Sequence, residues 1–292
     1  MLLLGSISAM EIKEFFDKNT STFSYIIYDK QTRDGVVLDS VLDYDPNSSS
    51  VTRDSLDKIT QFLNQNEINL KFILESHVHA DHMSASHFLK KEFPEAKSAI
   101  GSRVQAVQKV FGALFNSDLA CDGSQFDLLL EDQSITCAGS LSFKTLACPG
   151  HTPACCSFLF GDCLFTGDVI FMPDFGTGRC DFPEGSAEDL FHSIQRLYQL
   201  PDQTKVFVGH DYCPGGRELR FQSTIGEEKK LNKHLRSDTQ LEEFVSFRTS
   251  RDGELSAPRL LLPSLQVNLM AGQLPSKEVN GSRYLKIPLT GL

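Results

Sequence analysis

The chain has 292 residues, 40% of them hydrophobic and 23% charged, and a formal net charge of −10. These proportions are typical of a folded globular protein and exclude a largely disordered chain. The acidic balance and the lack of a Lys/Arg-rich run argue against a nucleic-acid partner. No segment approaches the roughly 20 apolar residues of a transmembrane helix, so we expect no membrane partner.

The first nine residues form an apolar stretch without a basic residue. The stretch is too short to span a membrane and lacks the basic start of a secretion signal. We expect a disordered leader over residues 1–9, followed by a natural start at Met10. The sequence leaves open whether this leader belongs to the native protein.

Short apolar runs that predict strands alternate with amphipathic stretches that predict helices. In chain order, strands are predicted over residues 23–29, 35–41, 70–76, 97–101, 140–149, 155–161, 163–171 and 204–210. Helices are predicted over residues 55–66, 84–93 and 186–200, the last with Ser186 at its N-cap. The first two strands flank turn residues and predict a hairpin. An α/β mixture with two runs of strands favours a layered sandwich over a simple parallel sheet.

Eight cysteines lie between positions 121 and 213, and none forms a CxxC pair. A chain of this size does not depend on disulfides, so we expect reduced thiols and a cytoplasmic location. A catalytic role for Cys155, Cys156 or Cys180 would require a depressed thiol pKa and access to substrate. Burial as small hydrophobic residues is the favoured role.

Residues with metal-binding side chains follow four of the predicted strands. Three of the eight histidines fall within residues 77–82, directly after the strand over 70–76. Later strands are followed by His151, Asp168 and His210, each after a glycine that allows a tight turn. Sites on open sheets gather at the carboxyl ends of strands, and imidazole with carboxylate suits zinc, iron or manganese. The sequence therefore predicts a metal site built from His77, His79, Asp81, His82, His151, Asp168 and His210.

These residues also allow other interpretations. Residues 77–82 could begin a water-exposed helix with Asp81 as its N-cap, although this would not explain candidate ligands at four strand ends. A structural zinc site would need a closed shell of four ligands, and more than four are present. The histidines at 87, 192 and 234 lie inside helical patterns and are expected to stand outside the site.

The motifs "HVHADH", "PGHT", "FTGD" and "GHD" occur in this order, and through them the chain resembles the metallo-β-lactamase family over roughly residues 23–211. The resemblance implies a four-layer αββα sandwich with a metal site at one edge of its sheets. The stretch "GDVIFMPDFGTGRCDFPEGS" resembles the G-x-x-R-x-D-F element of the persulfide dioxygenases. The tail, "RLLLPSLQVNLMAGQLP" and "NGSRYLKIPL", resembles the bacterial branch of this subfamily. One domain over residues 1–292 is implied, with about 215–292 as its family-specific C-terminal part.

The resemblance implies a dioxygenase that oxidises glutathione persulfide with O2 to sulfite and glutathione, in sulfide detoxification. It also implies one Fe(II) per chain, held by His77, His151 and Asp168, with positions open for substrate and O2. The remaining candidate ligands would form an outer shell or hold a second metal: His79, Asp81, His82 and His210.

Glutathione carries carboxylates that need cationic partners. Arg179, within "GTGRCDF", is the best candidate for a bidentate contact, and a salt bridge to Asp181 or Asp174 is the alternative. Tyr212 and Arg217 are weaker candidates for substrate binding.

Two other functions stay open at this point. A dinuclear zinc hydrolase of thioesters or lactones, similar to hydroxyacylglutathione hydrolase, would use all seven candidate ligands and a metal-bound hydroxide. A non-catalytic metal-binding module is the third. The sequence does not distinguish iron from zinc or identify the persulfide carrier. Apolar residues 258–270 could cover a contact in a homodimer as readily as the core.

Overall fold

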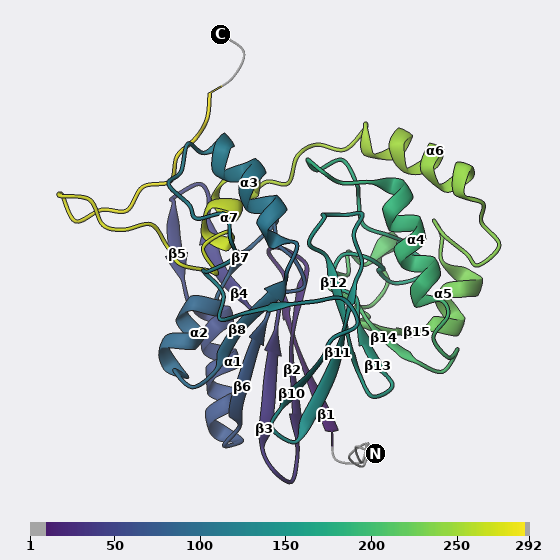
Figure 1. Cartoon of the computed structure of the whole chain (residues 1–292), viewed down its shortest axis with the longest axis horizontal. Coiled ribbons are helices and arrows are strands. Elements are labelled where there is room, and N and C mark those ends of the chain that lie inside the picture. Colours follow the sequence, from purple (N-terminus) through teal and green to yellow (C-terminus); the bar gives the residue numbers. More distant parts are fainter. Residues whose placement is uncertain (1–9, 290–292) are drawn as a thin grey trace.

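The computed structural model describes residues 10–289. Two six-stranded sheets face each other, and helices cover the outer face of each sheet (Figure 1). The predicted four-layer αββα sandwich is confirmed. The leader expected over residues 1–9 lies outside the described residues.

The first sheet begins with antiparallel strands and continues with parallel ones. Its strands, in spatial order, are β1 (Met10–Asp17), β2 (Thr22–Asp29), β3 (Asp34–Leu38), β6 (Asn69–Leu74), β8 (Lys97–Gly101) and β9 (Leu128–Leu130). The predicted hairpin is β2–β3. Its turn forms because Asp29 Oδ1 accepts the backbone N–H groups of Gln31 and Thr32, a turn role that suits a short carboxylate.

The second sheet follows the chain through consecutive antiparallel strands, and only its β13–β14 pair is parallel. Its strands are β10 (Ile135–Ala138), β11 (Leu141–Ala147), β12 (Cys156–Phe160), β13 (Cys163–Phe165), β14 (Lys205–Phe207) and β15 (Gln222–Thr224). A small third sheet contains β5 (Ser50–Thr52), β4 (Val41–Asp45) and β7 (Met83–Ser84).

Seven α-helices pack around these sheets within residues 10–289. They are α1 (Asp54–Gln65), α2 (Ser86–Glu92), α3 (Val104–Leu114), α4 (Ala187–Leu197), α5 (Ile225–Leu231), α6 (Leu241–Asp252) and α7 (Leu261–Asn268). The predicted N-cap of α4 is confirmed, because the Ser186 side chain accepts the Asp189 N–H. None of the helices described is long and apolar enough to cross a membrane.

The main core lies between the two sheets and is rich in phenylalanine. Four of its phenylalanines have at most 1% of their surface exposed: Phe23, Phe143, Phe158 and Phe165. Aromatic rings of this size bury much apolar area. A second cluster joins the first sheet to α1 and α2. The sequence left open whether the apolar residues 258–270 belong to the core or form a subunit contact. In the structure, Leu265 and Val267 from this stretch are buried in the core clusters.

Each predicted helix and strand has a counterpart in the structure, and most of them end earlier than predicted. The strand predicted over residues 163–171 is wrong beyond Phe165, because the chain turns there to present Asp168. Strand β1 and the helices α3 and α5–α7 were not anticipated. In α6, apolar and charged residues do not separate onto two faces, so periodicity gives no signal for that helix.

Helix α5 carries a carboxyl group whose ionisation should destabilise the fold. Glu228 is fully buried and accepts hydrogen bonds from Ser223 and Asn232. Burial raises its pKa to about 7, above the value of an unfolded chain, so unfolding should become easier as pH rises from about 4.5 to 7. We expect Glu228→Gln to stabilise the protein at pH 8 by on the order of 2 kcal/mol. The two proteins should be equally stable near pH 4, as measured by urea unfolding.

The control for this comparison is Glu243→Gln on α6, which replaces an exposed carboxylate away from Glu228. Its stability relative to the native protein should not rise between pH 4 and pH 8. If the free energy of unfolding depends on pH in the same way for Glu228→Gln and the native protein, the raised pKa of Glu228 would be contradicted.

Candidate metal centre

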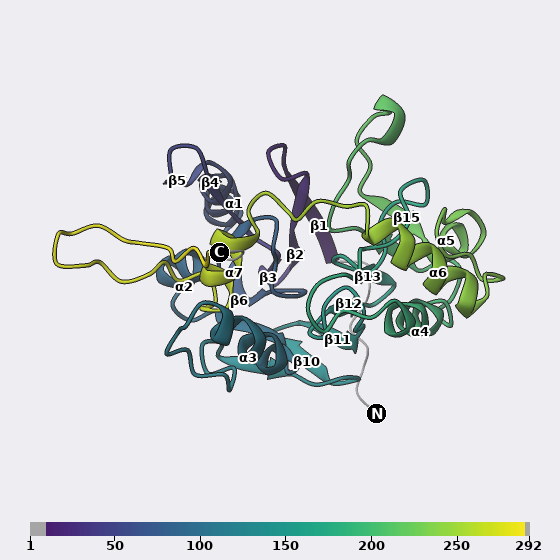
Figure 2. The same ribbon diagram turned by 90° about the horizontal axis from the view of Figure 1, so that it is seen from above.

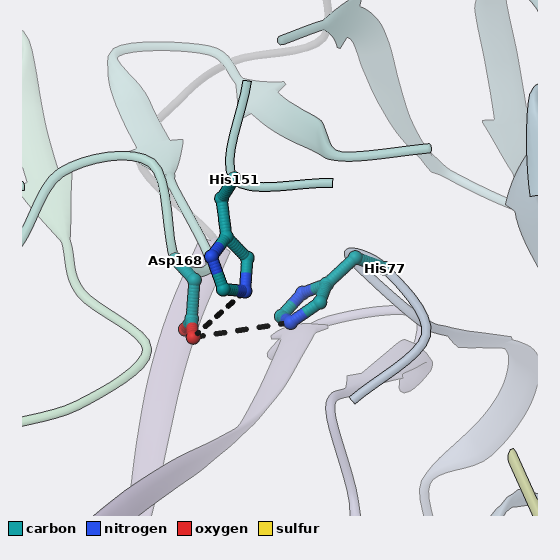
Figure 3. Close-up of side chains that lie close together, drawn as sticks. All are labelled: His77, His151 and Asp168. Atoms are coloured by element: carbon teal, nitrogen blue, oxygen red, sulfur yellow. Dashed lines mark ion pairs between the residues drawn. The ribbon is translucent and has the colours of Figure 1, made fainter. Parts of the chain in front are cut away.

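Three side chains from three strand ends converge at one edge of the sandwich (Figure 3). His77 follows β6, His151 follows β11 and Asp168 follows β13. The Nε2 atoms of His77 and His151 lie 3.8 and 3.6 Å from Asp168 Oδ2. All three residues are buried, and their donor atoms are close enough together to hold one ion.

Hydrogen bonds fix the orientation of both imidazoles. His151 Nδ1 donates to the Arg179 carbonyl oxygen at 2.7 Å, and His77 Nδ1 lies 2.9 Å from Ser76 Oγ. Burial and the neighbouring His79 hold the pKa of His77 well below its ordinary value. Both rings direct Nε2 toward Asp168, and the Arg179 carbonyl, which can only accept, fixes the Nδ1–H tautomer of His151 that a metal ligand at Nε2 requires.

A second group shares Asp168 with the first. His210 Nε2 lies 3.3 Å from Asp168 Oδ1 and 3.4 Å from Asp81 Oδ2. Burial lowers the pKa of His210, but the two carboxylates outweigh it and raise the pKa to about 9. The donor atoms of Asp81, Asp168 and His210 could also hold an ion.

The structure places His79 differently from His77. Its Nε2 lies 3.1 Å from Asp39 Oδ1 and 3.2 Å from Glu75 Oε2, two buried carboxylates. His79 also lies near Asp81 and His82, and the His82 Nδ1 atom is 3.2 Å from Asp81 Oδ2. All seven predicted ligands are thus gathered in one region, in overlapping groups.

The burial of unpaired donor atoms supports a metal in this region. Among the described residues, three buried ring nitrogens here have no hydrogen-bond partner: His77 Nε2, His79 Nδ1 and His82 Nε2. Buried polar atoms without partners are costly and uncommon. A cation coordinated by such atoms removes this cost, so the donor set fits a metal ion.

Two glycines allow the ligand loops to fold. Gly150, before His151, has φ 144°, and a Cβ there would lie 2.4 Å from the Leu190 backbone on α4. Gly167, before Asp168, has φ 51°, and a Cβ there would lie 2.5 Å from Ser76 Oγ. Any other residue would strain these turns and move the ligand that follows.

A cavity of about 420 Å³ opens beside the metal-binding side chains. Asp81, His151 and Asp168 line its inner part. Much of its wall is apolar, formed by Phe171, Phe175, Phe182, Tyr212, Leu255 and Leu260. Its size and lining suit a small-molecule substrate.

The three predicted substrate residues have different surroundings. Arg179 lines the cavity, but both ends of its guanidinium contact the Asp181 carboxylate, at 2.6 and 2.5 Å. Tyr212 also lines the cavity and stacks on His210 with ring centroids 5.6 Å apart. Arg217 is not among the cavity-lining residues.

Arg217 instead ties two loops together beside the site. Its guanidinium contacts Asp211 and Asp174, with Nη1 2.6 Å from Asp211 Oδ2 and Nη2 2.8 Å from Asp174 Oδ1. We therefore propose that Arg217 has a structural role, holding the loop that carries His210 and Tyr212.

The prediction that His234 lies inside a helix is wrong. Helix α5 ends at Leu231, and His234 follows in a turn that lines the cavity. Its Nδ1 accepts the Thr177 backbone N–H at 3.1 Å, so the neutral ring carries its proton on Nε2. Asn232 is the residue that could have indicated this turn in the sequence. Its side chain accepts the backbone N–H groups of His234 and Leu235 and supports the turn.

Several thiols lie near the site, but none is activated. The cysteines at 155, 156 and 180 are buried and free. Burial raises the pKa of Cys155 to about 12 and also raises that of Cys156 and Cys180. A reactive thiol needs a lowered pKa, so burial as small hydrophobic residues is favoured.

Comparisons with known proteins identify the family of the chain. Residues 19–210 match the family model described as the metallo-beta-lactamase superfamily. The chain is 45% identical over 285 residues to glyoxylase B2 of Dictyostelium discoideum, covering 97% of this chain and 98% of that protein. It is 31% identical over 258 residues to the mitochondrial persulfide dioxygenase ETHE1 of Homo sapiens, covering 87% and 85%. Among solved structures, it resembles ETHE1 from Myxococcus xanthus, with a TM-score of 0.73 and 30% identity over 90% of this chain and 100% of that one.

Proposed function

Because the chain belongs to the metallo-β-lactamase superfamily, we propose that it is a persulfide dioxygenase that uses one Fe(II) and O2. Its substrate would be glutathione persulfide and its products sulfite and glutathione. The relative named persulfide dioxygenase ETHE1 in Homo sapiens, at 31% identity, and the ETHE1 structure from Myxococcus xanthus, at 30% identity, support this reaction.

The observation that carries the proposal is the group of His77, His151 and Asp168. Two imidazoles and one carboxylate converge there, while the Nε2 atom of His79 points to two buried carboxylates. Two histidines and one carboxylate with open positions are typical of non-haem Fe(II) oxygenases.

The reaction balances with one persulfide, one O2 and one water. Both atoms of O2 join the terminal sulfur, and water then cleaves the sulfur–sulfur bond to release glutathione and sulfite. Bound Fe(II) would activate O2 and relay electrons to it, while the four electrons that reduce O2 come from the sulfur, so the iron would be unchanged overall.

The residues of the chain would orient and shield this chemistry. Ser76 and the Arg179 carbonyl hold the two imidazoles in place, as outer residues do at metal sites. The aromatic wall of the cavity, including Phe171 and Phe182, would keep water from the reacting sulfur.

A dinuclear zinc hydrolase of thioesters or lactones is the second candidate. The position of Asp168 supports this hydrolase, because its Oδ2 atom faces His77 and His151 while its Oδ1 atom faces His210. A carboxylate in this position can bridge two metals. The relative named glyoxylase B2, at 45% identity, points to the same class.

Metal content combined with oxygen uptake tests the proposal. Protein purified without added metal is analysed for iron and zinc, and O2 consumption is measured with glutathione persulfide. About one iron per chain with O2 uptake would support the dioxygenase. About two zinc ions per chain without O2 uptake would contradict it and support a hydrolase.

Asp81→Ala separates the two candidates. Asp81 lies in the group with His210 and outside the group with His77 and His151. For a mononuclear dioxygenase, we expect the variant to keep about one metal per chain and lose at most ~10–100-fold in kcat/KM. Loss of a second metal together with nearly all activity would instead indicate a dinuclear enzyme. Asp162→Ala, a substitution of a partly exposed turn residue, is the control.

A further inference from the structure

Two of the arginines that line the cavity already have their charge neutralised. Arg179 contacts both oxygens of Asp181. Arg248 is buried and contacts Asp252 Oδ1 through Nε at 2.9 Å and Nη2 at 2.6 Å. A substrate carboxylate would have to displace these partners, so neither arginine is readily available to an anion.

Three other cations line the same cavity and are exposed. Lys233 follows α5, Arg251 lies in the last turn of α6, and Arg259 precedes α7. Within residues 10–289, Lys233 and Arg259 form no salt bridge, and Arg251 has only Glu254 at 3.7 Å. We name these three residues the basic rim.

Acidic and basic residues line different parts of the cavity. The acidic residues among those that line it are Asp81 and Asp168, in the metal-binding region. The basic rim lies at the solvent side, although the whole chain has a net charge of −10. A cluster of cations on an acidic protein attracts anions locally and speeds their arrival.

The fold brings the basic rim to the site from the C-terminal part of the chain. The link between α6 and α7 crosses above the edge of the two sheets (Figure 2), and Leu255, Pro258 and Leu260 of this link line the cavity. All three rim residues lie outside the matched range 19–210. This region therefore adds a charge pattern to the site that the matched fold does not include.

We propose that Lys233, Arg251 and Arg259 bind the carboxylates of the substrate's thiol carrier while its sulfur reaches the metal-binding residues. The inference rests on the proposed function, because it takes the carrier to be a small thiol with carboxylates, such as glutathione. A cavity of about 420 Å³ suits a ligand of this size. Exposed cations without a close carboxylate partner can bind and orient the carrier, while the Arg179 carbonyl accepts the His151 Nδ1 hydrogen bond.

S-methylglutathione tests the basic rim without any turnover, because its sulfur is blocked. Its Kd is measured by calorimetry for the purified holoprotein and for Lys233→Gln, Arg251→Gln and Arg259→Gln. Each single substitution is expected to weaken binding about 2- to 5-fold, and the triple variant about 10-fold or more. Affinity of the native protein should fall as salt rises, because exposed charges are screened.

Arg236→Gln is the matched control. Arg236 is exposed on the same segment, pairs with Asp238 at 3.3 Å and does not line the cavity. Its Kd should equal that of the native protein. The dimethyl ester of S-methylglutathione should bind the native protein more weakly than the free acid, and it should bind the triple variant and the native protein alike.

Wild-type affinity in the triple variant, equal affinity for the ester and the acid, or no binding of the probe to the native protein would each overturn the inference. These outcomes are distinct from failure of the proposed function. If binding depends on the basic rim but glutathione persulfide causes no O2 uptake, the role of the rim would be supported and the proposed dioxygenase activity would be contradicted.

Discussion

Replacing Asp168 by alanine is expected to remove the metal and to lower kcat/KM by about 10³-fold or more. Asp168 is the carboxylate shared by both ligand groups, within 3.8 Å of His77, His151 and His210. A catalytic metal contributes several kcal/mol to transition-state stabilisation, and each 1.36 kcal/mol corresponds to about tenfold in rate. Elemental analysis and oxygen uptake on the same preparation measure both effects.

The matched control is Asp162→Ala. Asp162 lies at the turn before β13, is partly exposed and lies 3.5 Å from Lys205. This variant should keep its metal and its activity. A metal content and turnover of Asp168→Ala close to those of the native protein would exclude His77, His151 and Asp168 as the catalytic metal site.

Asp252→Ala is expected to destabilise the protein by about 3–5 kcal/mol. The substitution leaves the Arg248 guanidinium buried without its carboxylate, with only 3% of that side chain exposed. An unpaired buried charge has a cost of this size. Asp252 also accepts the Cys180 backbone N–H at 2.7 Å, so the loop whose Arg179 carbonyl holds His151 should loosen as well. Urea unfolding measures the stability, and kcat/KM reports the loop.

A double variant separates the buried charge from simple loss of packing. Arg248→Met with Asp252→Leu removes both charges and should destabilise less than Asp252→Ala alone. Glu254→Ala, an exposed substitution two residues further on, should stay within about 0.5 kcal/mol of the native protein. A loss of less than 1 kcal/mol in Asp252→Ala would show that the pair contributes little to stability.

Much of the fold and all seven candidate ligands could be predicted from the sequence because their signals are local. The β2–β3 hairpin is marked by its turn residues, and the N-cap of α4 by Ser186. His77, His151, Asp168 and His210 each follow a strand, so the sequence indicated that they lie at strand ends, where sites on sheets gather. The packing of the first sheet, which contains β6, on the second, which contains β11, β13 and β14, then brings the four residues together. The helices of the C-terminal part gave a weaker signal, because α6 has no distinct apolar face.

Only the tertiary structure decided which charged side chains have partners. The sequence by itself determined the metal-binding residue types and their positions at strand ends. It did not determine that Arg179 pairs with Asp181, that Arg217 joins Asp174 to Asp211, or that His234 lines the cavity. The folded chain decides these outcomes, because each arginine has several carboxylates within reach, from Asp181 next to Arg179 to Asp174 far along the chain from Arg217. The charge of an arginine is readily available to a ligand only where no carboxylate of the folded protein holds it closely. The basic rim at residues 233, 251 and 259 is decided in the same way, because the fold brings the segment after α5, the end of α6 and the α6–α7 link to one cavity.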